Sequence, residues 1–137
     1  MNTNSPAAYE DAVVALLAAA NVGRTRSDER GDPSAPLITA GWTPADPPDV
    51  ITVTGYDIQA GPDPIEPAWG AVQVLVRSKH RRTRNTVMDA VRAALRVEHV
   101  QAGPLTVQRI YETSYADLAR DTNSDNWRAT INVRVFA

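Results

Sequence analysis

Apolar side chains near the start of the chain recur every three to four positions, which is the pattern of an amphipathic helix. Ser5 is a suitable N-cap, Pro6 suits the first helical position, and Gly23 is a candidate stop. This stretch therefore predicts a helix with one buried stripe. The stripe consists of Tyr9, Val13, Leu16, Leu17 and Ala20.

A second helical pattern occupies residues 83–99 in the middle of the chain. Its apolar residues share one face, and its charged residues are expected on the other sides of the helix. The apolar set is Val87, Met88, Val91, Ala94 and Leu95, and the charged set is Arg84, Asp89, Arg92 and Arg96.

The remaining ordered stretches carry the β-branched and aromatic residues that are typical of strands. They lie at 50–56, 71–78, 105–115 and from Trp127 to the C-terminus, and 116–120 is expected to form a turn or a helical piece. The last strand alternates between apolar and polar residues, which predicts one buried side. That side consists of Trp127, Ala129, Ile131, Val133 and Val135.

Two long segments rich in proline separate these elements. Residues 24–48 offer only Leu37, Ile38 and Trp42 as apolar anchors. Residues 57–70 join two strands as a hairpin, and their prolines exclude both a helix and a regular ladder. Loops of this length are frequently functional, so we expect both to contact a partner.

These elements predict an α+β fold with a single domain over residues 1–137, in the order α-β-β-α-β-β. Hairpin-like connections favour an antiparallel or mixed sheet, and both helices are expected to pack on one face of it. A length of 137 residues suits one core of this kind. The other face of the sheet is then left for something else to cover.

The segment 121–126, DTNSDN, has oxygen-bearing side chains at the first, third and fifth positions of a calcium loop. Such a loop needs glycine at the sixth position and a bidentate glutamate at the twelfth. This chain has Asn126 and Asn132 at those positions. We therefore interpret the segment as a polar turn rather than a metal site.

Composition narrows the possible functions. The formal net charge of -2 leaves no overall electrostatic footprint for nucleic acid, and the absence of cysteine excludes a disulfide framework. Known catalytic and nucleotide-binding motifs are missing, and His80 and His99 lack a spaced partner, so neither an enzyme nor a cofactor is expected. The longest apolar run, 12–20, is shorter than the roughly 20 residues of a membrane span, and residues 1–11 lack the basic start of a signal peptide.

The sequence RSKHRRTR over 77–84 is the one concentrated basic patch. Clustered cations would suit phosphate contacts with DNA, or they would form a solvated turn or meet acidic residues of a neighbouring subunit. The lack of interleaved aromatic residues favours the second interpretation. Trp42 and Trp69 lie in the proline-rich loops, where an aromatic side chain is either a local anchor or an interface hot spot.

This layout resembles the tail-terminator or minor capsid proteins at the head-tail joint of long-tailed bacteriophages. The resemblance covers most of the chain and rests on the order and spacing of short stretches, none of which is a catalytic motif. The segment 24–36 is longer than the family pattern, and Trp127 stands where a basic residue is expected. The stretches are LLAAANVG, GWTPADPPDVITVTGYD, WGAVQVLVRS, VMDAVRAAL and LARDTNSDNWRATINVRVFA.

The resemblance implies a structural protein of the virion, located at the head-tail junction and in the host cytoplasm during assembly. Its copies would form a ring, commonly a hexamer, that caps the tail tube, ends its elongation and joins it to the head connector. The implied partners are other copies of the chain, the tail tube protein, the neck proteins, and DNA that passes through the lumen without specific binding; no membrane is involved. A head-side neck adaptor is the alternative, and a small DNA-binding accessory protein is a third.

Surfaces for such a ring would be the loops at 24–48 and 57–70, an unclaimed sheet face and an exposed final strand. Six copies would carry a formal charge of six times -2, or -12, which would keep passing DNA from adhering. The residues expected at subunit or partner interfaces are Arg77, Arg81, Arg82, Arg84, Arg128, Arg134, Trp42 and Trp69.

Overall fold

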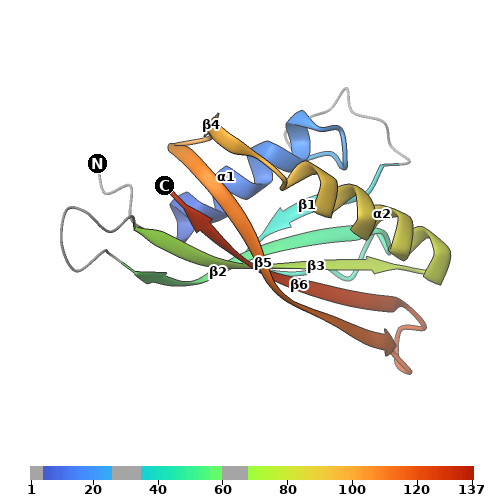
Figure 1. Ribbon diagram of the computed structural model, residues 1–137. Helices are drawn as coiled ribbons and strands as arrows, with labels where there is room; N and C mark the ends of the chain where they lie inside the picture. Colours follow the sequence, from blue (N-terminus) through green and yellow to red (C-terminus); the bar gives the residue numbers. More distant parts are fainter. Residues whose placement is uncertain (1–4, 26–34, 60–67) are drawn as a thin grey trace.

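A computed structural model describes residues 5–25, 35–59 and 68–137 of the chain (Figure 1). Two helices and a six-stranded sheet make up this part of the protein. Neither helix is long and apolar enough to cross a membrane. The elements are α1 (Pro6–Ala19), β1 (Leu37–Ala40), β2 (Val50–Gln59), β3 (Trp69–Ser78), α2 (Arg81–Ala94), β4 (Glu98–Ala102), β5 (Leu105–Arg120) and β6 (Trp127–Phe136).

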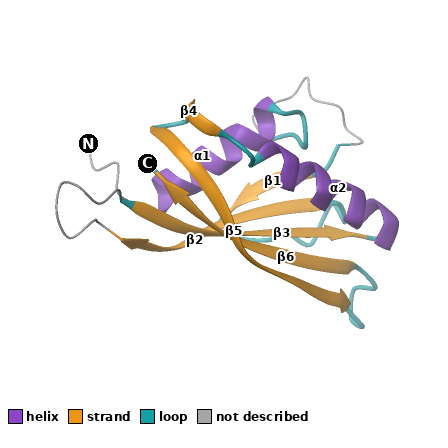
Figure 2. Ribbon diagram, viewed as in Figure 1, coloured by secondary structure: helices purple, strands orange, loops and turns teal. Residues whose placement is uncertain are grey.

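The strands form one mixed sheet in the order β1-β2-β3-β6-β5-β4. Strand β1 runs parallel to β2, and every other neighbouring pair is antiparallel. Figure 2 shows the strong twist of the sheet, which turns β5 across the other strands. The α+β class and the mixed sheet were predicted correctly from the sequence.

The predicted element order was wrong, because the structure has the order α-β-β-β-α-β-β-β. Strand β1 lies inside the segment that was expected to be a loop, and β4 follows α2. Residues 116–120 continue β5 instead of turning, because their backbone pairs with β6. The final strand is not an exposed edge either, since β6 lies between β3 and β5.

One hydrophobic cluster joins the buried residues of both helices to the sheet. The predicted buried side of the last strand is confirmed, because Ala129, Ile131, Val133 and Val135 are buried and Trp127 is half-buried, although Thr130 on the opposite side is buried too. Among the anchors predicted in segment 24–48, Leu37 and Ile38 are buried, as expected. Trp42 is not an anchor of this core, since 59% of it is exposed.

Helix α1 begins as predicted, because the Ser5 hydroxyl accepts a hydrogen bond from the Ala8 N–H at 3.2 Å and Pro6 follows. The helix ends at Ala19, before the predicted stop at Gly23, and Asn21 takes the left-handed conformation there with φ of 57°.

Two glycines let α1 approach the sheet closely. A Cβ atom at Gly55 would lie 2.5 Å from the Pro6 carbonyl oxygen, and the Gly55 N–H donates to the Glu10 carboxylate at 2.9 Å. A Cβ atom at Gly70 would lie 2.4 Å from the ring of Tyr9, which is 1% exposed. The missing side chains therefore set the distance between α1 and strands β2 and β3.

We predict that Gly70→Ala lowers the free energy of unfolding by about 1–3 kcal/mol, because the added methyl group must displace the buried Tyr9 ring. Urea unfolding measures the change. The matched variant Tyr9→Phe should leave stability unchanged or slightly higher, since the Tyr9 hydroxyl is buried without a hydrogen-bond partner in the described part of the chain. A Gly70→Ala protein as stable as the wild type would contradict the close packing of α1.

Candidate interface between helix α2 and strand β5

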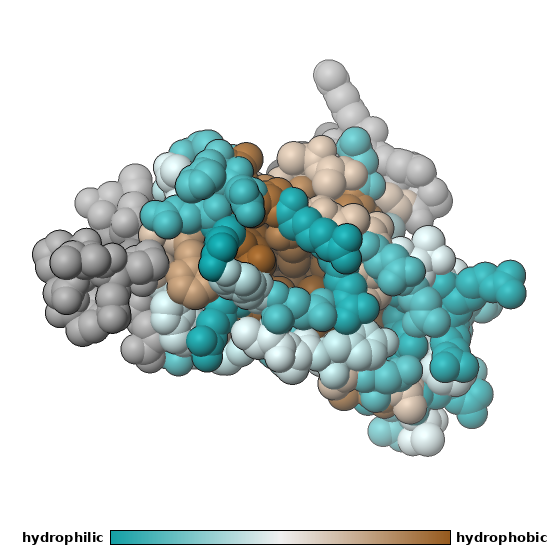
Figure 3. Space-filling model, viewed as in Figure 1, coloured by the Kyte–Doolittle hydropathy of each residue, from teal (hydrophilic) through white to brown (hydrophobic). Residues whose placement is uncertain are grey.

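A groove separates α2 from β5, and core side chains form its floor. Its cavity measures about 430 Å³. Figure 3 shows apolar side chains, coloured brown, at the bottom of this hollow between hydrophilic rims. We call it the α2–β5 groove, and its lining residues are Arg92, Leu95, Arg96, Ile110, Tyr111, Glu112, Ile131 and Val133.

Arg92 closes one side of the groove by reaching from α2 to β5. Its guanidinium donates to the Glu112 carboxylate at 2.6 and 2.9 Å, and it lies 4.7 Å from the ring centroid of Tyr115. The hydrogen bond with Glu112 raises the pKa of Arg92. Both side chains are about one third exposed, so this ion pair contributes no more than about 1 kcal/mol to stability.

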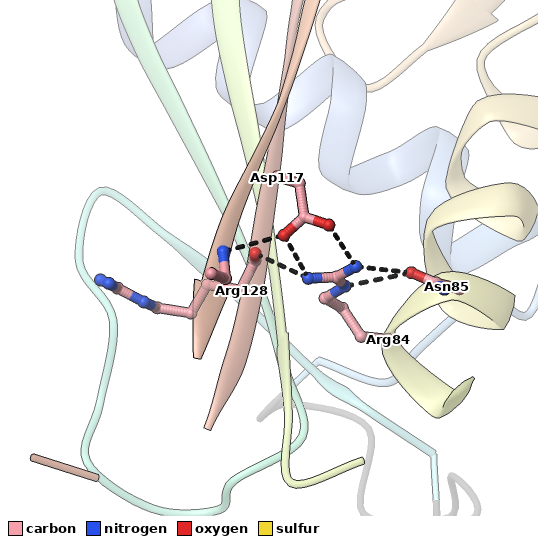
Figure 4. Close-up of polar contacts among 5 residues, drawn as sticks. Arg84, Asn85, Asp117 and Arg128 are labelled. Carbon is pink, nitrogen blue, oxygen red and sulfur yellow. Dashed lines mark hydrogen bonds and ion pairs between the residues drawn. The ribbon is translucent and has the colours of Figure 1, made fainter. Parts of the chain in front are cut away.

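Arg84 makes the second connection and is buried. Its side chain is 1% exposed and forms a bidentate pair with Asp117 at 2.8 and 3.0 Å (Figure 4). It also donates to the Arg128 carbonyl at 3.0 Å and to the Asn85 side chain at 2.8 and 3.1 Å. These bonds satisfy a charge that would otherwise be costly to bury.

The Asp117 carboxylate is held in its ionised form. The hydrogen bond from Arg84 is the main cause that lowers the pKa of Asp117, and the Ala119 N–H, which donates at 2.8 Å, lowers it further. Asp117 remains 40% exposed, so the pair is buried on its arginine side only.

Sequence reasoning placed Arg84 on the wrong side of its helix. Arg84 falls at i, Met88 at i+4, Val91 at i+7 and Leu95 at i+11, which puts it on the buried stripe of α2. The spacing of Arg84 along the helix could therefore have predicted its burial. Its ion-pair partner could not be predicted from spacing, because Asp117 is 33 residues away in the sequence.

Arg77, the first residue of the predicted basic patch, also has intrachain partners. Its guanidinium donates to the backbone carbonyls of Pro44 at 2.7 Å, Pro47 at 2.8 Å and Pro48 at 3.1 Å. Desolvation by burial is the main cause that lowers the pKa of Arg77. Arg77 thus fastens the loop between β1 and β2 to the sheet.

The other predicted interface residues are spread over the surface and are not gathered at one site. Arg81 and Arg82 are exposed on α2, and Arg81 lies 5.7 Å from the ring centroid of Trp127. Arg134 stacks over Trp69 at 4.4 Å. The backbone of Arg128 pairs with that of Arg77, and its side chain points away from Arg84 in Figure 4. Contacts of these residues with other subunits remain predictions.

The polar turn predicted at 121–126 is confirmed. The Asp121 carboxylate accepts hydrogen bonds from the Asn123 N–H at 2.9 Å and the Ser124 hydroxyl at 3.0 Å. These bonds, with the Asn123 contribution the largest, lower the pKa of Asp121. Within residues 5–25, 35–59 and 68–137, no three His, Asp or Glu side chains are grouped to hold a metal ion.

We predict that Asp117→Asn lowers the free energy of unfolding at pH 7 by about 1–3 kcal/mol, because the buried Arg84 guanidinium loses its counter-charge. The Asp117 contribution is complete above the ordinary pKa of about 3.9 and is lost as pH falls through its lowered pKa. The difference in stability between the two proteins should therefore be constant above about pH 4 and shrink as the pH falls through the lowered pKa of Asp117. Urea unfolding from pH 7 to about pH 2 measures this, with the exposed Asp11→Asn as control; a difference that stays constant over this whole range would contradict it.

Comparisons with known proteins identify a solved structure with the same fold but no family for this chain. No protein-family model matches the sequence, and no curated protein matches it. Among solved structures, a chain from a structure titled "Virion of native gene transfer agent (GTA) particle" superposes with a TM-score of 0.60 and 14% sequence identity. The match covers 80% of this chain and 88% of that chain. This protein therefore has the fold of a chain found in a virion structure.

Proposed function

We propose that this protein is a structural component of a phage-like virion that forms a ring at the head-tail junction and terminates the tail. The observation that carries the proposal is the fold shared with a chain of the gene transfer agent virion, over 88% of that chain. The resemblance of the sequence stretches to tail-terminator proteins supports the finer assignment. No catalytic step and no cofactor belong to this role.

The arrangement of the sheet suits a ring. A ring requires a heterologous contact, in which one surface of a subunit meets a different surface of the next. In this chain the β1 side and the β5–β4 side lie at opposite ends of the strand order, and they carry different features. The α2–β5 groove lies beside β5, and the loop fastened by Arg77 follows β1.

The proposed partners are the tail tube protein on one side of the ring and the head connector on the other. The hairpin between β2 and β3 and the segment 24–48 would contact them. Residues 60–67 and 26–34 of these segments lie outside the described residues. A hexameric ring with a formal charge of six times -2 would let DNA pass without adhering.

A head-side neck adaptor is the second candidate, since the same fold and ring would serve it. A DNA-binding accessory role has less support, because the basic patch does not act as one surface. Arg77 and Arg84 bind partners within the chain. The exposed cations of the patch are therefore Lys79, His80, Arg81 and Arg82.

Depletion of this protein during particle production should yield overlong tails without heads, because nothing would cap the growing tube. Negative-stain images of the lysate show tail length and head attachment directly. Expression of the wild-type chain from a plasmid is the control and should restore joined particles. Tails of normal length that fail to join heads would contradict termination and support the adaptor.

The DNA-binding alternative predicts affinity that falls steeply with salt, through the exposed cations of the patch. We expect no such binding by the wild-type protein, and no change when Lys79, Arg81 and Arg82 are all replaced by alanine. Arg84 is left in place because it is buried in the fold. Fluorescence anisotropy with duplex DNA at several salt concentrations measures this, and salt-dependent binding lost in the triple variant would contradict the proposed role.

A further inference from the structure

Trp42 is exposed, and the chain on both sides of it is attached to β2. On one side of it the Gly41 N–H donates to the Val53 carbonyl at 2.9 Å, and on the other the Thr43 hydroxyl lies 2.8 Å from that of Thr52. The tryptophan is 59% exposed between these two attachments. Attachment of the chain on both sides of an aromatic residue reduces the entropy that is lost when the residue docks, which suits an interface anchor.

The loop that carries Trp42 is also held in place and is acidic. The three proline carbonyls that accept from Arg77 fix residues 44–48 against the sheet. Asp46 and Asp49 lie in this loop, and each favours the charged form of Arg77 from beyond ion-pair distance. Trp42 therefore stands beside a carboxylate-bearing surface.

The α2–β5 groove has the complementary character. Leu95, Ile131 and Val133 form an apolar floor, and the cavity of about 430 Å³ has room for one large side chain. Of the cations on its rim, Arg92 is neutralised by Glu112. Arg96 has no carboxylate within 4.0 Å in the described part of the chain, so the rim keeps one positive charge free.

These two surfaces belong to opposite ends of the sheet. Trp42 follows β1, the first strand in the sheet order, and the groove borders β5 at the other end. A contact between two different surfaces at opposite ends of the sheet can repeat from copy to copy in one direction, which is the arrangement that closes a ring.

We propose that Trp42 of one copy inserts into the α2–β5 groove of the next copy, with the acidic loop of 44–49 facing Arg96. The contact is heterologous and would close the ring, so it rests on the proposed ring-forming function. It assigns a partner to the groove, whose rim includes the exposed residues Arg96 and Tyr111.

Disulfide cross-linking tests the contact cleanly, because the chain has no cysteine of its own. The double variant Ala45→Cys with Arg96→Cys places a thiol on each proposed surface, at two exposed positions. Under mild oxidation it should give a ladder of covalent oligomers on a non-reducing gel. The matched control, Ala45→Cys with Ala7→Cys on the exposed side of α1, should give no ladder.

Adding Trp42→Ala to the double-cysteine variant should abolish the ladder and weaken association by about 30-fold or more in sedimentation measurements. Tyr56→Ala, which removes an aromatic residue of 56% exposure from β2, should leave the ladder unchanged. A ladder that survives Trp42→Ala, or one lost only with Tyr56→Ala, would overturn the inference.

Mixing separates a contact between the two different surfaces from one that joins identical surfaces, and the ladder of the double variant separates a head-to-tail chain from a two-fold pair, which would stop at a dimer. The single variants Ala45→Cys and Arg96→Cys should each stay largely uncross-linked, and an equimolar mixture should give one covalent dimer. Cross-linking of either single variant with itself to the same extent would overturn the proposal. If the cross-linking fails, the depletion experiment still tests whether the protein terminates tails. If depletion leaves tails of normal length while the ladder persists, termination is refuted and the contact is retained.

Discussion

The buried guanidinium of Arg84 holds helix α2 against strands β5 and β6. Arg84 lies on the apolar stripe of α2 and binds Asp117 on β5 and the backbone carbonyl of Arg128 on β6. Because a buried charge is tolerated only with all its hydrogen bonds made, α2 and the far end of β5 are fixed relative to each other. A second pair, Arg92–Glu112, joins the same two elements and lines the α2–β5 groove. The fold and the candidate interface therefore depend on the same pairing of α2 with β5.

Arg77 has a similar role for the loop between β1 and β2. Its guanidinium holds that loop against the sheet, as the guanidinium of Arg84 holds α2 against β5. Arg77 gathers three proline carbonyls and so gives shape to a loop that has few N–H groups for regular structure. Trp42 is presented from the ordered edge of that loop. Two arginines of one short basic segment thus shape two different surfaces. Two of the six cationic side chains of that patch thus act as internal scaffolding in the structure, and the other four are exposed.

The features that the sequence predicted correctly are those that depend on side-chain spacing and on hydrogen bonds between nearby residues. The N-cap at Ser5, the β2–β3 hairpin, the alternation of β6 and the turn at 121–126 all follow from side-chain spacing and short-range hydrogen bonds. Strand β1 was missed because its pairing with β2 is parallel and lies beyond a long polar segment. The end of β5 was missed because its side chains are exposed and only its backbone pairing makes it a strand. The groove could not be predicted from local patterns either, because residues from three elements, α2, β5 and β6, form it together.

The central claim is that this chain is built into the head-tail junction of a particle as a ring. The most direct measurement is a cryo-electron microscopy reconstruction of that junction in purified particles that encode the chain. We predict a closed ring of copies at the head-proximal end of the tail tube, with Trp42 of each copy seated against α2 of its neighbour. Particles that lack the protein, or that carry it only as isolated copies away from the junction, would contradict the account.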